Sequence, residues 1–309
     1  MKTDEVRGLA RVVGIESALA NPDVAHLVVH GNNVSGMHKI DGLDVRALEE
    51  ENGISVRIVV REGSVIENPV HLCFGLLGTT GTQKIKLVVD AQAGSRISIL
   101  AHCAFPNAID IEHVMDAKVH ISEHAQYSYS ERHVHGLDGG VRVYPKARVT
   151  LGKGARFYTG FELIEGRVGL IDIDYEVVCS EHSVMEMTAK ISGKGEDIIR
   201  IREVGNLEGS GSRGVLTSRV AVSGQARADV YNKLLASASG ARGHVDCKEI
   251  VQAGAIATAT PVVEVRHPQA RITHEAAIGS VDVKQLETLM SRGLTEEQAV
   301  ELIIRGLLQ

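Results

Sequence analysis

Aromatic side chains are scarce in this chain: they make up 3% of the 309 residues, and tryptophan is absent. Because 44% of the residues are nevertheless hydrophobic, the core has to be built from valine, isoleucine, leucine and alanine. Layers of such small branched side chains suit a β-solenoid better than a sandwich built around large aromatics. Proline is also rare, with 6 residues against 32 glycines, a ratio that many glycine turns between short strands would produce.

Other absences exclude classes of function. The formal net charge of −6 does not support a nucleic-acid interface. The chain has no run of about 18 apolar residues, so no membrane span is predicted. The first ten residues carry Asp and Glu where an export signal needs a basic and then an apolar region, so we expect a cytoplasmic protein. The P-loop motif of ATP-binding proteins is also missing, which assigns any ATP hydrolysis to a partner.

The chain has four cysteines, too few for a disulfide framework in a protein of this length. In a reducing compartment, chemistry is the expected use of a cysteine that is not simply buried. Cys73 and Cys179 lie inside apolar, strand-like segments and are predicted to belong to the core. Cys103 and Cys247 therefore remain as candidates for a functional role.

The hydrophobic periodicity divides the chain into three parts. Residues 1–53 are predicted to be mostly helical, with one amphipathic run before Pro22 and a second short helix, LDVRALEEENG, closed by Gly53. From about Ile54 the period changes to two, most clearly over residues 168–178. This strand-rich pattern continues to residue 279, and residues 280–309 are predicted to be helical again.

The last thirty residues predict two short helices. Ser280 or Asp282 can cap the first, Gly293 ends it, and Thr295 with Gln298 forms a capping box for the second. Their apolar faces have to be buried against another surface. The side chains in question are Leu286, Leu289, Met290, Leu302 and Ile303.

Glycines punctuate the strand-rich region without a strict sequence period, so the pattern leaves a sandwich, a barrel and a β-helix open. The segment 209–214 matches the glycine pattern of dinucleotide-binding loops, but strand-like residues follow it, and we predict a turn. The expected turn glycines are Gly152, Gly166, Gly193, Gly195, Gly205, Gly224 and Gly240.

The densest set of metal-capable side chains lies in residues 241–281. RGHVDC, the Ala/Thr stretch up to Pro261, and THEAAIGSVD followed by LMSRGLTEEQAVELIIRG resemble the C-terminal core of the SufB/SufD family. These proteins are scaffold components of the SUF machinery that builds iron–sulfur clusters. The resemblance is specific from about Ala147 onward. It implies a mainly β fold, a right-handed parallel β-helix over residues 54–279 with helical segments at 1–53 and 280–309.

The resemblance also implies ligands for a nascent iron–sulfur cluster at the contact between two β-helices. Cys247 is the first of these, because thiolates are the preferred ligands of such clusters. His274 and Glu275 match the His-Glu pair of the SufB component. On a regular strand, His274 and Glu275 point to opposite faces, and Cys247 meets His244 only if a bend intervenes.

The chain departs from the family where the SufB component has a further cysteine and a histidine. Ala255 and Thr258 stand at those positions, so one thiolate ligand is missing. Replacements are sought in a histidine-rich zone between residues 102 and 135. Cys103 is the reserve candidate, and His102 beside it could lower the pKa of its thiol.

Two further histidines in that zone, His133 and His135, are two residues apart, so a strand places both on one face with metal-ligand spacing. Such spacing is common by chance, and it leaves a metal at this pair as one of several alternatives.

The resemblance therefore predicts a non-catalytic scaffold subunit. It would pair with itself or with a paralogous β-helix subunit, and it would carry a SufC-like ABC-type ATPase on about residues 280–309. A structural, SufD-like subunit without ligands of its own is the alternative that Ala255 favours. A β-helix enzyme acting on polysaccharide is a third, disfavoured because aromatic residues for sugar stacking and an export signal are lacking.

Overall fold

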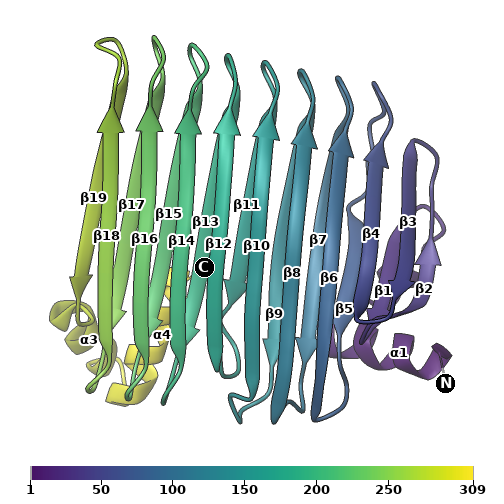
Figure 1. The fold of residues 1–309 in the computed structure, drawn as a ribbon. Helices are drawn as coiled ribbons and strands as arrows, with labels where there is room; N and C mark the ends of the chain where they lie inside the picture. Colours follow the sequence, from purple (N-terminus) through teal and green to yellow (C-terminus); the bar gives the residue numbers. More distant parts are fainter. Residues whose placement is uncertain (1, 309) are drawn as a thin grey trace.

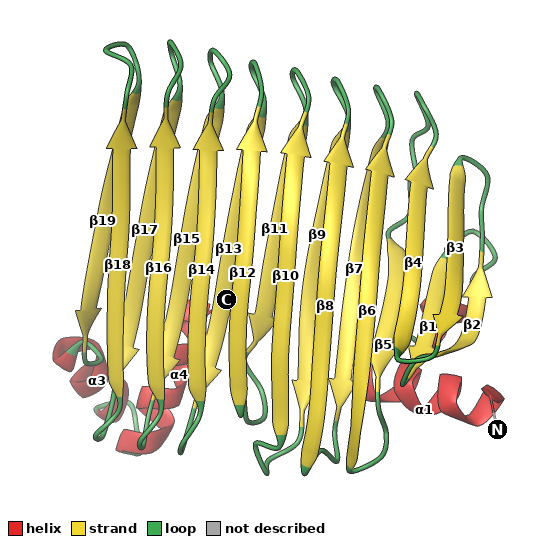
Figure 2. Cartoon of the chain, viewed as in Figure 1, coloured by secondary structure: helices red, strands yellow, loops and turns green. Residues whose placement is uncertain are grey.

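The computed structural model describes residues 2–308, which form two facing β-sheets wound into one parallel β-helix of about eight turns (Figure 1). The expected mainly β fold with flanking helices is confirmed (Figure 2). One sheet holds, in spatial order, β19 (Arg271–Gly279), β17 (Arg242–Val251), β15 (Arg213–Val222), β13 (Val184–Gly193), β11 (Arg156–Leu163), β9 (Gln126–His135), β7 (Arg96–Phe105), β5 (Val70–Gly75), β1 (His26–His30) and β2 (Asn33–His38). The other holds β18 (Ile256–Val265), β16 (Arg227–Ala236), β14 (Ile198–Leu207), β12 (Leu170–Cys179), β10 (Val141–Leu151), β8 (Asp110–Ile121), β6 (Thr80–Ala91), β4 (Gly53–Val60) and β3 (Leu43–Glu50).

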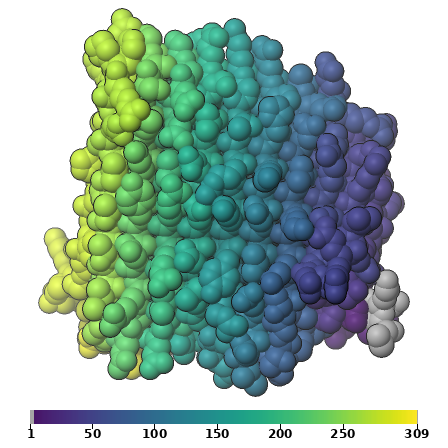
Figure 3. Space-filling view, in the orientation of Figure 1, coloured from purple at the N-terminus to yellow at the C-terminus, as the bar shows by residue number. Residues whose placement is uncertain are grey.

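Successive turns of the β-helix stack in register. Ile111 pairs with Val141, an offset of 30 residues, and Leu170 pairs with Ile198, an offset of 28. Because the offset varies by a residue or two between turns, the sequence has no strict repeat even though the strands stack regularly. The turns appear as parallel bands of colour on the molecular surface (Figure 3).

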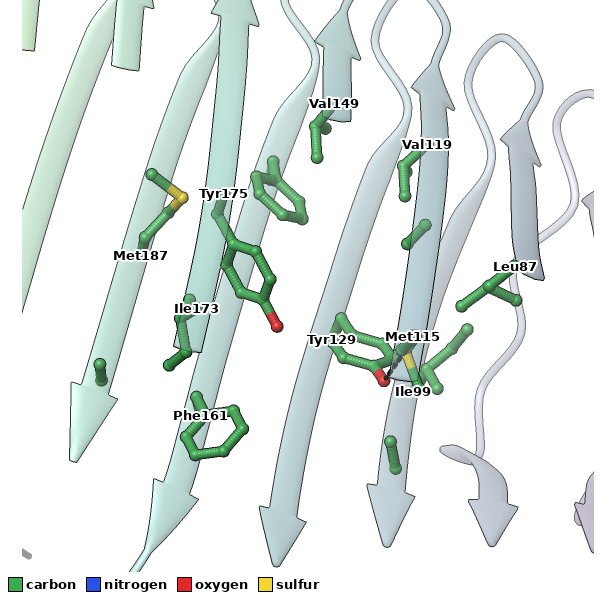
Figure 4. Close-up of a cluster of buried hydrophobic side chains, with 14 of the residues drawn as sticks. Leu87, Ile99, Met115, Val119, Tyr129, Val149, Phe161, Ile173, Tyr175 and Met187 are labelled. Atoms are coloured by element: carbon green, nitrogen blue, oxygen red, sulfur yellow. Dashed lines mark hydrogen bonds between the residues drawn. The ribbon is translucent and has the colours of Figure 1, made fainter. Parts of the chain in front are cut away.

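The core is the narrow space between the two sheets. Along β12, buried and half-buried residues alternate without interruption, as the period of two predicts. Tyr129, Tyr175 and Phe161 enter this space among branched aliphatic side chains, and the Tyr129 hydroxyl donates to the Met115 sulfur at 3.6 Å (Figure 4). Cys179 is buried in this core, and Cys73 is buried in a separate small hydrophobic cluster with Val28 and Ala104, so both are buried as predicted.

The N-terminal end of the β-helix is closed by extra elements. Helices α1 (Lys2–Val13) and α2 (Glu16–Ala20) precede two antiparallel hairpins, β1–β2 and β3–β4. Leu9 of α1 and Val28 of β1 are buried in a small hydrophobic cluster. This cluster is separate from the core between the sheets, so α1 packs on the outer face of the first strands, while the hairpins extend the two sheets beyond β5 and β4.

The predicted second helix at the N-terminus is wrong. Residues 43–50 form strand β3, and the helical part of residues 1–53 ends at Ala20. Leu43 and Val45 are buried and pair with Val60 and Ile58 of β4, so interstrand pairing overrides a modest helical propensity. The strand region therefore begins at His26. Gly205, expected in a turn, instead lies within β14, where the lack of a side chain leaves room for Met185.

The C-terminal helices have the expected ends. In α3 (Val283–Met290), the Asp282 carboxylate accepts a hydrogen bond from the Gln285 amide at 2.7 Å. Thr295 and Gln298 form the reciprocal capping box of α4 (Glu296–Leu308). Both helices lie at the lower rim of the last turns (Figure 1).

A buried carboxylate joins two neighbouring turns at the lower rim. Asp197 accepts hydrogen bonds from the backbone amides of Val168, Gly169 and Lys194 at 2.8–3.0 Å. It also accepts from the Arg167 guanidinium at 2.9 and 3.0 Å. The carboxylate thus satisfies backbone groups that would otherwise be buried without partners.

We expect Asp197→Asn to lower the free energy of unfolding by about 2–4 kcal/mol, because the amide replaces one acceptor oxygen by a donor and removes the charge facing Arg167. Urea unfolding followed by circular dichroism measures this. Asp110→Asn is the control, because its ion pair with Arg142 is exposed and contributes about 0–1 kcal/mol. Equal unfolding midpoints for the two variants would contradict the assigned role of Asp197.

Candidate functional site

Cys247 points into the interior of the β-helix. In β17, Val245, Cys247 and Glu249 face inward and are buried, whereas His244 and Asp246 do not. The strand is regular, so Cys247 and His244 do not meet. His244 instead bonds to the Thr273 hydroxyl at 2.8 Å, and Asp246 pairs with Arg219.

Polar side chains surround the Cys247 thiol. Ser218 of β15 is its register partner, and the Asn232 amide on the facing sheet lies 3.5 Å from both the Cys247 Sγ atom and the Ser218 hydroxyl. Burial raises the pKa of the Cys247 thiol. We call Glu203, Ser218, Asn232, Cys247 and Glu249 the C-terminal interior cluster.

The two carboxyl groups of this cluster lie in a poor environment for charge. Glu203 and Glu249 are buried, and one oxygen of each, together with the Asn232 side-chain oxygen, has no hydrogen-bond partner among residues 2–308. Burial raises the pKa of Glu203 to about 8 and that of Glu249 to about 7. Both groups can therefore hold a proton at neutral pH.

His274 and Glu275 lie on β19, an edge strand of the first sheet. His274 is in register with the inward-facing Val245, and Glu275 with the outward-facing Asp246. The two side chains thus point to opposite faces, as predicted, and Glu275 reaches Lys248 at 3.7 Å. Within one chain, His274 shares the interior face with Cys247, whereas Glu275 does not.

The histidine-rich zone supplies a second interior group, which we call the central interior cluster: Cys103, His113, Glu131, His133 and His135. Cys103 and His133 are register partners on β7 and β9, and His113 faces them from β8 of the other sheet. The Cys103 Sγ atom lies 3.6 Å from Glu131 Oε1 and 3.7 Å from His113 Nε2. His133 Nε2 lies 2.6 Å from Glu131 Oε1.

Hydrogen bonds fix the orientation of two of these rings. The Arg167 carbonyl can only accept, so His135 donates to it through Nδ1 at 3.0 Å. Burial lowers the pKa of His135 to about 3, so the ring is neutral and its Nε2 accepts from His133 Nδ1 at 3.1 Å. The remaining nitrogen of His133, Nε2, is therefore the one directed at Glu131.

The expectation that His102 lowers the pKa of Cys103 is wrong. His102 points to the other face of β7 and stacks on His71. Burial and the nearby Glu131 carboxylate instead raise the pKa of the Cys103 thiol well above its ordinary value. Around Glu131, burial opposes ionisation, but the His133 hydrogen bond outweighs it, and the pKa of that carboxyl is lowered.

The two interior clusters are separate. Five strand spacings, at about 4.8 Å each, place β7 roughly 24 Å from β17. Cys103 and Cys247 of one chain therefore cannot bind the same cluster. Ala255, at the position of the missing family cysteine, lies just before β18 and packs against the core.

Sequence reasoning missed the carboxylates of both clusters, although a signal for them exists. Glu131 is two residues before His133, and Glu249 is two residues after Cys247, so strand alternation assigns each to the same face as its neighbour. Glu203 and Asn232 carry no such local signal. They meet Cys247 only because the opposite sheet faces it.

A two-walled parallel β-helix with a Cys, His and Glu set in its interior is the class that fold and site define. The SufBD core domain of the SUF iron–sulfur cluster assembly system matches residues 77–307. The chain belongs to this family. It is 35% identical over 282 residues to an iron–sulfur cluster assembly SufBD family protein of Methanocaldococcus jannaschii, covering 91% of this chain and 89% of the relative. A Pyrococcus horikoshii protein of the same description is 35% identical over 295 residues, covering 96% and 90%.

We expect the free energy of unfolding to fall as pH rises from about 5 to 8, by up to ~1.4 kcal/mol per pH unit from Glu203 alone. The sign follows because the pKa of Glu203 is raised on folding, so the folded state holds a proton that the unfolded state releases. Glu203→Gln should flatten this slope, while Glu186→Gln, at an exposed position, should not. Unfolding midpoints across this pH range measure the effect, and equal slopes in wild type and Glu203→Gln would contradict it.

Proposed function

We propose that this protein is a non-catalytic scaffold subunit of a SUF-type iron–sulfur cluster assembly complex, and that a nascent cluster forms at the contact between two β-helices. Membership of the SufBD family supports a role in cluster assembly. The observation that carries the scaffold proposal is the open C-terminal end of the β-helix, where His274 lies.

This open end has the properties of an interface. Strands β18 and β19 each pair on one side only, and no residue of the described strand β19 is buried. Ile256 and Ile278 are about half exposed there. Unpaired strand edges and exposed apolar side chains favour association with another sheet, and a second copy or a paralogous subunit can extend both sheets.

The cluster is cargo, and its ligands would come from both sides of that contact. Cys247 is the first-choice ligand because thiolate is the preferred donor. Its thiol lies one strand behind the open edge, so β19 has to shift to expose it. His274 on the interior face and Glu275 on the outer face would complete a mixed set from two chains. Such a set holds a cluster less tightly than four thiolates, as release requires.

The C-terminal helices would bind a SufC-like ABC-type ATPase. No residue of the described helix α3 is buried, and α4 buries Ala299 and Leu308. Met290 and Leu302 are 42% and 49% exposed. These exposed apolar side chains suit a protein partner in the cytoplasm. No described helix is long and apolar enough to cross a membrane.

A structural, SufD-like subunit without cluster ligands is the second candidate. Ala255 at the position of the family cysteine favours it, as does the complete burial of Cys247. The two candidates share the fold and partners and differ only in ligation.

We expect anaerobic reconstitution with iron and sulfide to give a visible-absorbing centre on the dimer, and Cys247→Ala, His274→Ala or Glu275→Ala to weaken or abolish it. Cys179→Ala is the matched control, because this thiol is also buried but lies inside the apolar core. Absorption spectra and iron content, with sedimentation for the dimer, are the measurements. An unchanged spectrum and iron content in Cys247→Ala would favour the SufD-like alternative.

We expect Met290→Asp combined with Leu302→Asp to abolish co-purification with the ATPase, because two charges would enter an apolar contact. The β-helix should stay folded, since both side chains are exposed. Leu137→Asp, on a turn where the leucine is 81% exposed, controls for added charge. Normal co-purification of the double variant would refute this docking site.

A further inference from the structure

The central interior cluster has the composition of a metal site that is separate from the open end of the β-helix. Ligand atoms of Cys103, Glu131 and His133 all lie within 4.8 Å of one another. All three side chains are buried, with at most 2% of their surface exposed. Thiolate, imidazole and carboxylate together suit zinc or ferrous iron, whereas magnesium and calcium prefer sites made of oxygen atoms alone.

The distance between the Cys103 sulfur and the Glu131 carboxylate matches tetrahedral coordination. Bonds of about 2.3 Å to sulfur and about 2.1 Å to nitrogen or oxygen, at tetrahedral angles, place such atom pairs about 3.6 Å apart. Cys103 Sγ lies 3.6 Å from Glu131 Oε1. His113 Nε2, which is not one of the three ligands, lies 3.7 Å from the sulfur. Glu131 Oε1 and His133 Nε2, at 2.6 Å, have the separation of two groups that share a proton. An ion in place of that proton would move them to about 3.4 Å.

A second layer already orients the ligands. Histidines that bind metals usually donate their other N–H to a fixed acceptor. His133 donates through Nδ1 to His135, and His135 donates to the Arg167 carbonyl, so His133 Nε2 is directed inward. Phe161 lies 4.7 Å from the His133 ring between centroids, and Phe105 lies 5.0 Å from the His113 ring. The aromatic rings limit how far the imidazoles can rotate.

Two buried atoms of the cluster lack hydrogen-bond partners among residues 2–308: Glu131 Oε2 and His113 Nδ1. A carboxylate oxygen left in this way is costly in a closed interior. A thiolate and a carboxylate carry the two negative charges that neutralise one divalent ion. The loaded site would therefore be electrically neutral inside the core.

We propose that Cys103, Glu131 and His133 bind one resident divalent transition-metal ion, zinc or ferrous iron, inside the β-helix, with His113 beside the sulfur and His135 as a positioning residue. The ion would join β7 and β9, two neighbouring strands of one sheet. Because the site is sealed, it would hold its ion permanently, unlike an assembly site that releases its product.

The test is the metal content of the full chain purified anaerobically without added sulfide, and again after unfolding and refolding with zinc, ferrous iron or cobalt. We expect about one ion per chain, with elemental analysis separating zinc from iron. In the cobalt form, a thiolate-to-metal charge-transfer band would report Cys103. Cys103→Ser should remove the band, while Cys179→Ala, a buried thiol elsewhere in the core, should keep it.

Glu131→Gln separates metal binding from folding. Its amide can still donate to His133 Nε2, so the fold should survive while a charged ligand is lost. His135→Phe should weaken metal affinity roughly 10–100-fold in a chelator competition, with an unchanged circular dichroism spectrum.

Two results would overturn this proposal: wild-type protein with below about one-tenth of an ion per chain after refolding with all three metals, or full stoichiometry in folded Glu131→Gln. Either result leaves cluster assembly at the open end untouched, since that is scored separately with sulfide and Cys247→Ala. Conversely, a protein that holds the resident ion but forms no cluster on reconstitution with iron and sulfide would count against cluster assembly alone.

Discussion

The in-register stacking of parallel strands is the constraint on which the rest of this structure depends. Each turn places every side chain directly above its equivalent in the next turn, so one inward-facing position fixes a column of neighbours. Cys103 lies next to His133 and Ser218 next to Cys247 for this reason. A slip of one residue would turn every interior side chain outward. The polar groups of the interior therefore meet only if the register is held over many turns.

The interior is narrow, and polar groups within it are costly unless they have partners. The two interior clusters meet this cost differently. In the central interior cluster, imidazoles and a carboxylate form a chain of hydrogen bonds that ends on the Arg167 carbonyl. In the C-terminal interior cluster, the carboxyl groups of Glu203 and Glu249 have raised pKa values and can stay neutral. The first arrangement suits a cation, whereas the second suits bound protons.

The sequence predicts the parts of this structure that depend on local pattern. Period-two alternation gives the strands and the opposite orientation of His274 and Glu275, and capping residues give both C-terminal helices. Prediction from the sequence fails where tertiary contacts decide the secondary structure. Strand β3 was expected to be a helix because its pairing with β4 cannot be seen in the local sequence. The expected effect of His102 on the pKa of the Cys103 thiol is wrong for a related reason, because neighbouring residues in a strand point to opposite faces of the sheet. Partners on the facing sheet, such as Asn232 for Cys247, cannot be read from spacing at all.

The two ends of the β-helix differ in a way that bears on assembly. At the N-terminal end, antiparallel hairpins form the last strands of both sheets, and α1 packs on the outer face of the first sheet. At the C-terminal end, parallel strands are the last ones, and α4 lies under the lower rim, where Val300 and Ile304 face a hollow that Ser192, Ala221 and Ser223 also line. The edges of β18 and β19 stay uncovered as a result (Figure 1). Because the helices and the strand edges are different surfaces, a partner bound to one does not have to displace a partner bound to the other. The second β-helix and the ATPase proposed above would therefore not compete for one surface.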